Sequence, residues 1–220
     1  MRVAVSQIDT QAGDLAHTAE RMAQMSATAA ERGVDLLVFG VATLSGPTSF
    51  SHGLADAFEE DLSSTLTALA GRVSCDGLVP VVVFDGDDPA IEAMLLRDGT
   101  ARPLRFVDVP ASPLGEGEGG LPLVTFEAGG SRLGLAFCSE DLEAWCERSG
   151  GVDVLVYLAP YGYAIDDASS ALGSALVEGR DVDDARELGS WLVAASSVGG
   201  YGGVVYPGSS FALDPKGRLV

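Results

Sequence analysis

In the first part of the chain, stretches in which apolar residues have the spacing of a strand are followed by stretches in which they have the spacing of a helix. Residues 2–8 alternate and are rich in Val and Ile, which predicts a strand. A helix is expected next, capped by Asp14 and running to about residue 32. Residues 35–39 are largely apolar and predict a buried strand, and residues 54–73 predict a second helix.

The rest of the chain shows the same mixture of periods. Further strands are predicted over residues 78–84, 91–96, 121–126, 131–137, 152–158, 191–196 and 210–213. Residues 167–188 are expected to be helical in part, because Gly173 and Gly179 weaken the helix. Short turns join some neighbouring strands, at residues 85–88 and at residues 129–130. Together these elements predict an α/β layered fold with a mixed sheet and a single domain over residues 1–220.

The charge balance of the chain limits its partners. Its 32 acidic and 13 basic residues give a formal charge of −19. Such a surface repels phosphate groups, so we expect no nucleic acid partner and no anionic membrane partner. Three cysteines without CxxC spacing predict neither a disulfide framework nor a zinc site, and they are typical of a reducing, cytoplasmic location. We expect no metal and no other cofactor.

Two glycine-rich stretches are typical of loops and turns rather than of nucleotide sites. Residues 115–120 match GxGxxG, but they lead into a strand, and Glu116 and Glu118 would repel a pyrophosphate. Residues 199–203 lack the lysine of a phosphate-binding loop and are expected to form a turn at the sheet edge.

One cysteine occupies a position where an α/β fold can display a nucleophile. Cys138 follows a predicted strand and precedes a segment that is expected to be helical. The chain has two histidines: His17 is expected on the surface of a helix, and His52 lies in a predicted loop. Its one lysine is Lys216, close to the end. The groups that normally activate a thiol are therefore scarce.

The order and spacing of these segments resemble the nitrilase, or carbon–nitrogen hydrolase, superfamily. The likeness is closest to the glutamine-hydrolysing domain of NAD synthetase. It lies in the opening strand and helix start, the second strand, the nucleophile segment and the C-terminal strands, at residues 1–15, 33–39, 129–141, 196–200 and 208–217. The resemblance implies an αββα sandwich with mixed β-sheets, chemistry on the C–N bonds of small amides, and a homodimer.

Family members use a glutamate base, a lysine and a cysteine nucleophile in one pocket. Carried over onto this chain, Cys138 takes the place of the nucleophile, Val41 that of the glutamate and Phe106 that of the lysine. The segment between residues 110 and 121 is shorter than the corresponding segment of family members. Family members also continue, after the last turn seen here, with a further strand and a tail. An apolar pocket lowers the thiolate fraction of a cysteine, so the resemblance implies a dismantled triad.

Three functions are consistent with this pattern. The first is a catalytically degenerate pseudoenzyme, kept as a binding, scaffolding or regulatory subunit of a homodimer or hetero-oligomer. The second is an active thiol amidohydrolase in which Cys138 attacks a small amide with a rearranged base and cation. The third is a sensor that holds a small molecule in the apolar pocket. Candidates for the rearranged groups are the bases Glu116, Glu118, Glu140 and His52 and the cations Arg105 and Arg102.

Overall fold

The structure, a computed structural model, describes residues 1–9, 13–45, 55–85, 88–104, 123–137, 139–147, 151–158, 163–164, 183, 186–201, 204–208 and 210–220. A first sheet has the strand order β1-β2-β3-β4-β5, with β1 Val3–Ser6, β2 Leu36–Phe39, β3 Asp76–Asp85, β4 Asp88–Arg97 and β5 Thr100–Leu104. A second sheet has the order β13-β10-β8-β7-β6, with β6 Thr125–Ala128, β7 Ser131–Ala136, β8 Val154–Leu158, β10 Trp191–Ala195 and β13 Phe211–Leu213. A small third sheet has the order β11-β12-β9, with β9 Tyr163–Ala164, β11 Val198–Tyr201 and β12 Val204–Pro207.

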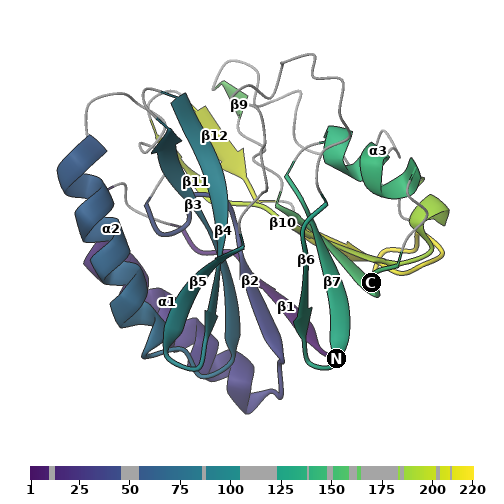
Figure 1. Cartoon of the computed structure of the whole chain (residues 1–220), viewed down its shortest axis with the longest axis horizontal. Coiled ribbons are helices and arrows are strands. Elements are labelled where there is room, and N and C mark those ends of the chain that lie inside the picture. The colour runs from purple at the N-terminus through teal and green to yellow at the C-terminus, as the bar shows by residue number, and fades with distance from the viewer. Residues whose placement is uncertain are drawn as a thin grey trace.

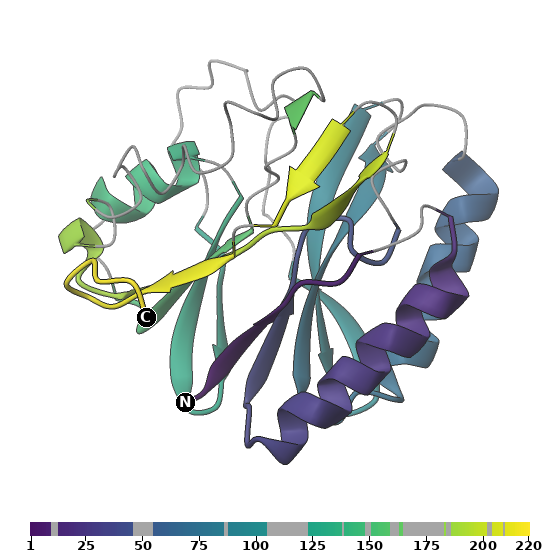
Figure 2. The ribbon, with the colours of Figure 1, turned by 180° about the vertical axis from the view of Figure 1, so that it is seen from behind.

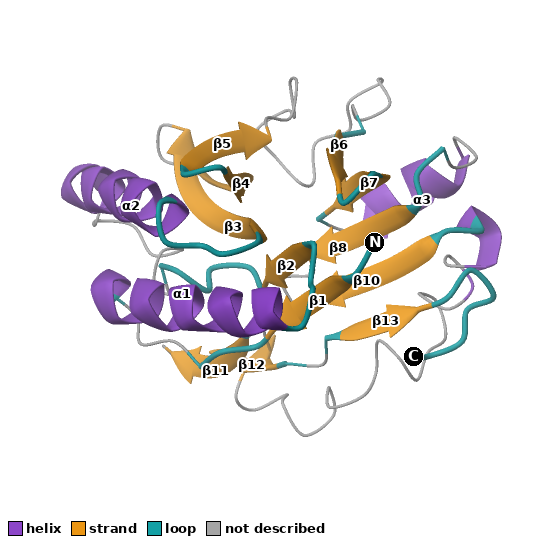
Figure 3. Ribbon diagram, turned by 90° about the horizontal axis from the view of Figure 1, so that it is seen from below, coloured by secondary structure: helices purple, strands orange, loops and turns teal. Residues whose placement is uncertain are grey.

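The helices and the two large sheets form four layers, which Figure 1 shows side by side and Figure 3 shows from below. Helices α1 (Leu15–Glu31) and α2 (Ala55–Ala70) cover the outer face of the first sheet, and α3 (Ser139–Glu147) covers the outer face of the second. Three apolar clusters fill the spaces between these layers. The predicted α/β layered fold with mixed sheets is therefore confirmed.

Helix α1 forms as its sequence predicts. The Asp14 carboxylate caps the helix by accepting a hydrogen bond from the backbone N–H of His17, at 3.1 Å. Residues three or four positions apart, including Leu15, Ala19 and Met22, are buried against the first sheet, whereas the His17 side chain is exposed. Both the expected helix and the expected surface histidine are thus confirmed.

Four strands, β5, β9, β11 and β12, were not predicted from the sequence. Strand β5 was not expected; it follows an Asp-Gly pair, Asp98 and Gly99, whose φ angles of 50° and 73° make a tight two-residue turn after β4. The glycine-rich residues 199–203 were expected to form a turn, yet residues 198–201 form β11, which pairs with β12. Gly199 has φ 121°, a backbone conformation that residues with a Cβ rarely adopt, so this strand favours glycine at that position. Most of the helix predicted over residues 167–188 lies outside the described residues.

Candidate functional site

The strand directions bring the segments of interest to one end of the sandwich. Strands β1, β2 and β3 are parallel, and β5 has the same direction because two antiparallel pairings separate it from β3. Strands β7, β8 and β10 are also parallel. The two sets point the same way, since Asp9, just after β1, bridges in parallel to Val198, just after β10. Figure 2 shows β1, in dark purple, rising from the N-terminus. The carboxyl ends of β2, β5 and β7, which precede Val41, Phe106 and Cys138, therefore share one end of the molecule.

Val41 lies in the apolar core between the two sheets. The residue is 2% exposed, and it belongs to the same cluster as Leu78 and Leu95 of the first sheet and Leu135 and Val156 of the second. An aliphatic side chain in this cluster can neither accept a proton nor hydrogen-bond a substrate. The described part of the site thus holds no proton-transfer group at the position that the resemblance assigns to the base.

The backbone around Val41 is fixed by the segment that follows β10. A Cβ on Gly40 would lie 2.7 Å from backbone atoms of Ser196 and Ser197, so glycine is needed for the two segments to touch. The Ser197 hydroxyl donates a hydrogen bond to the Val41 carbonyl. Residues 40–45 are all buried. Residues 40–45, which we call the wall of the site, are therefore closely packed and hydrogen-bonded, although the side chain at position 41 is apolar.

Ala42 adds local strain to this wall. Its φ of 57° is in the left-handed region, which costs a residue with a Cβ about 1 kcal/mol. The turn is closed by the Thr43 N–H, which donates to the Gly40 carbonyl at 3.2 Å. Non-glycine residues in such conformations concentrate at binding and catalytic sites, where the surrounding structure holds them in place.

The segment on either side of Cys138 is held by α3. The Asp141 carboxylate, in the first turn of that helix, accepts a hydrogen bond from the Phe137 N–H at 2.8 Å. The Trp145 indole N–H donates to the Leu135 carbonyl at 2.8 Å, and its ring rests on Gly134, where a Cβ would lie 2.6 Å away. These contacts fix the end of β7 relative to the start of α3, the two elements that flank Cys138.

Most other predicted site residues lie outside the described residues. They are His52, Arg105, Phe106, Glu116, Glu118 and Cys138. Glu140 is part of α3, but its side chain also lies outside the described part. Arg102 is on β5, where it lines a surface hollow with Arg97. Sequence reasoning missed Asp141 and Ser197; an acidic residue in the first turn after a strand end was the available signal for the former.

Among the described residues, the pKa that is shifted most belongs to a structural turn rather than to the strand-end site. The Arg218 guanidinium, followed by the backbone N–H groups of Arg218 and Lys216, lowers the pKa of Asp214 to about 2. The Arg218 Nε lies 2.6 Å from the Asp214 carboxylate, and the two N–H groups lie 2.9 Å from it. Because Asp214 follows β13 and its carboxylate closes the turn to Arg218, this shift reports a stabilised turn.

No group of three or more His, Cys, Asp or Glu side chains in the described ranges is placed to hold a metal ion. None of the helices that the structure describes is long and apolar enough to cross a bilayer.

Comparisons with known proteins agree with this architecture. Residues 2–220 match the sequence profile of the family described as carbon-nitrogen hydrolase. An amidase from Nesterenkonia sp. superposes with a TM-score of 0.72 at 20% identity, covering 100% of this chain and 84% of the amidase chain. A mutant of the amidase from Nesterenkonia sp. AN1, with acrylamide added to its active-site cysteine, gives 0.74 at 21% identity and covers 100% and 87%.

A second kind of relative shares the fold. The glutamine-dependent NAD+ synthetase from Acinetobacter baumannii, in complex with ADP, superposes with a TM-score of 0.74 at 17% identity. That superposition covers 99% of this chain and 42% of the synthetase chain. No curated protein sequence matched this chain.

The layers, the strand order and the shared strand ends define a nitrilase-fold αββα sandwich. The chain belongs to the carbon–nitrogen hydrolase family.

Proposed function

We propose that this family member is a catalytically degenerate pseudoenzyme that acts as a binding, scaffolding or regulatory subunit. The observation that carries the proposal is the burial of Val41, 2% exposed, in the apolar cluster between the sheets. The resemblance puts the family's proton-transferring glutamate at this position. With valine there, the family reaction lacks its base.

The size of the expected loss supports this proposal. A general base contributes about 100-fold or more to a rate, and an oxyanion-stabilising donor contributes a similar factor. The family lysine is replaced by Phe106 in the sequence correspondence, and the sole lysine of the chain, Lys216, follows β13. Loss of both groups would leave about one part in 10⁴ of the family rate.

The retained packing of the site suggests what the fold is kept for. Gly40, Ala42 and Ser197 still hold the wall in a strained and buried conformation. A scaffold that lost chemistry without keeping a role would have no need of this arrangement. We therefore propose that the site end binds a small molecule or contacts a partner, which is either a second copy of the chain or another protein.

The reactivity of Cys138 tests the proposal against the active thiol enzyme. The native protein is treated with iodoacetamide at pH 7, and mass spectrometry follows Cys75, Cys138 and Cys146 separately. Each rate is compared with N-acetylcysteine and with the same cysteine in urea. We expect Cys138 to react no faster than the free thiol, because no described group activates it.

Rapid and stoichiometric alkylation of Cys138 alone, at about 100 times the rate of the free thiol, would contradict the pseudoenzyme. It would favour an amidohydrolase in which Glu116, Glu118, Glu140 or His52 serves as the base. The half-buried Cys75 and Cys146 provide internal references in the same sample.

A further inference from the structure

A surface hollow lies between strands β4 and β5, away from the strand ends that carry the candidate site. It has a volume of about 250 Å³ and is lined by Leu95, Arg97, Asp98, Thr100 and Arg102. Arg97 and Thr100 flank the two-residue turn that joins the strands, and Asp76, next to Arg97, is the first residue of β3. The hollow is therefore at the amino end of β3, whereas Val41 follows the carboxyl end of β2.

Arg97 is anchored at the side of this hollow. Its Nε donates to the Asp76 carboxylate at 2.9 Å, and its Nη2 donates to the Glu127 carbonyl of the second sheet at 2.7 Å. The bond to Asp76 raises the pKa of Arg97 above its usual value. The guanidinium is thus charged and held in one orientation, and its Nη1 makes no hydrogen bond to a described residue.

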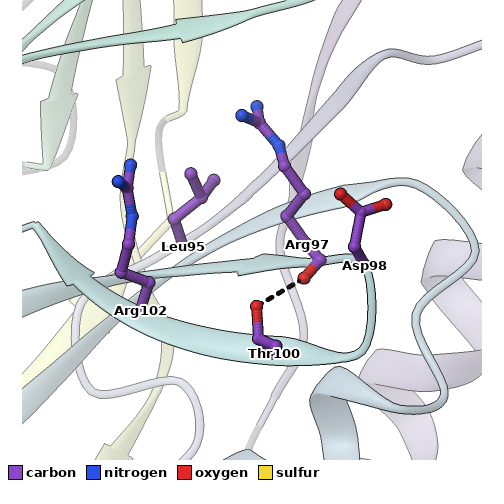
Figure 4. Close-up of a pocket in the computed structure, with 5 residues that line it drawn as sticks. All are labelled: Leu95, Arg97, Asp98, Thr100 and Arg102. Carbon is purple, nitrogen blue, oxygen red and sulfur yellow. Dashed lines mark hydrogen bonds between the residues drawn. The ribbon is translucent and has the colours of Figure 1, made fainter.

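Arg102 faces the same hollow without a partner in the described part of the chain. In the β4–β5 register Arg102 is opposite Leu95, and Arg97 is opposite Thr100. The two arginines are therefore diagonal neighbours on one face of the hairpin, about 7–8 Å apart at the backbone. Figure 4 shows both side chains rising on the same side, with Leu95 between them. Two like charges in this arrangement repel, and an anion placed between them removes the repulsion.

Within the described residues, Arg102 has no hydrogen-bonding or ionic partner, although the chain is rich in carboxylates. Acidic residues outnumber basic residues by 32 to 13, so a carboxylate partner was readily available in composition. Leu95 lines the base of the hollow but is 2% exposed, so only a small part of its side chain is accessible beside the guanidinium groups. Asp98 at the rim, together with the formal charge of −19, disfavours ligands that carry several negative charges.

We propose that this hollow binds a small organic monocarboxylate, whose carboxylate is held by Arg97 and Arg102. A guanidinium presents paired donors that match the two oxygens of a carboxylate. A volume of about 250 Å³ holds roughly eight water molecules, which is enough for a ligand of the size of benzoate. This site is separate from the strand-end site and does not rest on the proposed function.

Binding of benzoate, measured by NMR titration of the full chain, tests this proposal. We expect saturable binding with shifts at residues 95–102, and binding about tenfold weaker or absent in Arg102→Gln, because the charged donor is removed. Arg132→Gln is the matched control, since Arg132 is another arginine whose side chain has no hydrogen bond to a described residue, and it should change the affinity less than twofold. Benzyl alcohol, which has the ring but no carboxylate, should not bind.

Three results would overturn the proposal: no saturable binding of benzoate, equal affinity in Arg102→Gln, or equal binding of inorganic phosphate. Cys138→Ala should bind benzoate as the native protein does. Loss of binding in that variant, with shifts around β7 and α3, would show that the carboxylate occupies the other site. The outcome is thus independent of whether the chain is a pseudoenzyme.

Discussion

Replacement of Val41 by glutamate is expected to destabilise the fold by about 3–5 kcal/mol at pH 8. Val41 is 2% exposed in the cluster between the sheets, and the described residues place no cation beside it. An ionised carboxylate there would be buried without a partner, which is among the most destabilising single changes. Urea denaturation of Val41→Glu and of the unchanged protein gives the difference in free energy of unfolding.

The pH dependence of stability distinguishes the effect of the new charge from the effect of the larger side chain. Burial should raise the pKa of the introduced glutamate above its unfolded value of about 4.3. Val41→Gln is the neutral control. Below pH 4 the Val41→Glu variant should be as stable as this control. As the pH rises from the unfolded-state pKa of the glutamate to its higher folded-state pKa, the Val41→Glu variant should lose stability relative to the control. Equal stability of both variants at pH 8 would contradict the account, because position 41 would then be open to water or next to a cation.

Substitution of Gly40 by alanine is expected to be the most disruptive change at the site wall. The new Cβ would lie 2.7 Å from backbone C, O and N atoms of Ser196 and Ser197, which cannot rotate away. Overpacking of this kind costs about 1–3 kcal/mol and occasionally more, and we expect the upper end of that range because the neighbour is backbone. The segment after β2 should separate from β10, and the bond between the Ser197 hydroxyl and the Val41 carbonyl should be lost.

Gly77→Ala is the matched control for that change. Gly77 is also buried in the first sheet, and a Cβ there would be 3.6 Å from Leu96, which is ordinary contact. Its stability should stay within about 1 kcal/mol of the unchanged protein. Thermal and urea unfolding of the two alanine variants would contradict the account if both lost the same stability or if Gly40→Ala were neutral.

The fold could be predicted well where local pattern and burial agree. Helix α1 has a capping aspartate and an apolar face at helical spacing, and β2 and β8 are short apolar runs; each forms close to the expected bounds. Strand β5 was missed because its sequence, Thr-Ala-Arg-Pro-Leu, contains a proline and an arginine, and edge pairing with β4 rather than composition makes it a strand. Strand β11 was missed because glycines at 199 and 200 suggest a turn, whereas the φ of 121° at position 199 favours glycine within the strand.

The sequence could propose single positions of the candidate site, but not the contacts that surround them. Sequence correspondence selected Val41, and the residue is buried as expected of an aliphatic side chain, but its place in a functional site stays a prediction. The contact of Ser197 with the Val41 carbonyl joins residues 156 positions apart, and no local pattern signals such a bond. The role of Asp141 depends on how α3 is seated by Trp145 on Gly134, which is a property of the packed structure.

The measurement that tests the central claim most directly is ammonia release from a panel of small amides that includes glutamine and butyramide. The unchanged protein and Cys138→Ala are assayed side by side at the same concentration over several hours. The account predicts that the unchanged protein releases no more ammonia than Cys138→Ala does. Turnover in the unchanged protein that disappears in Cys138→Ala would contradict it and would establish a working amidase with a base other than the one missing at Val41.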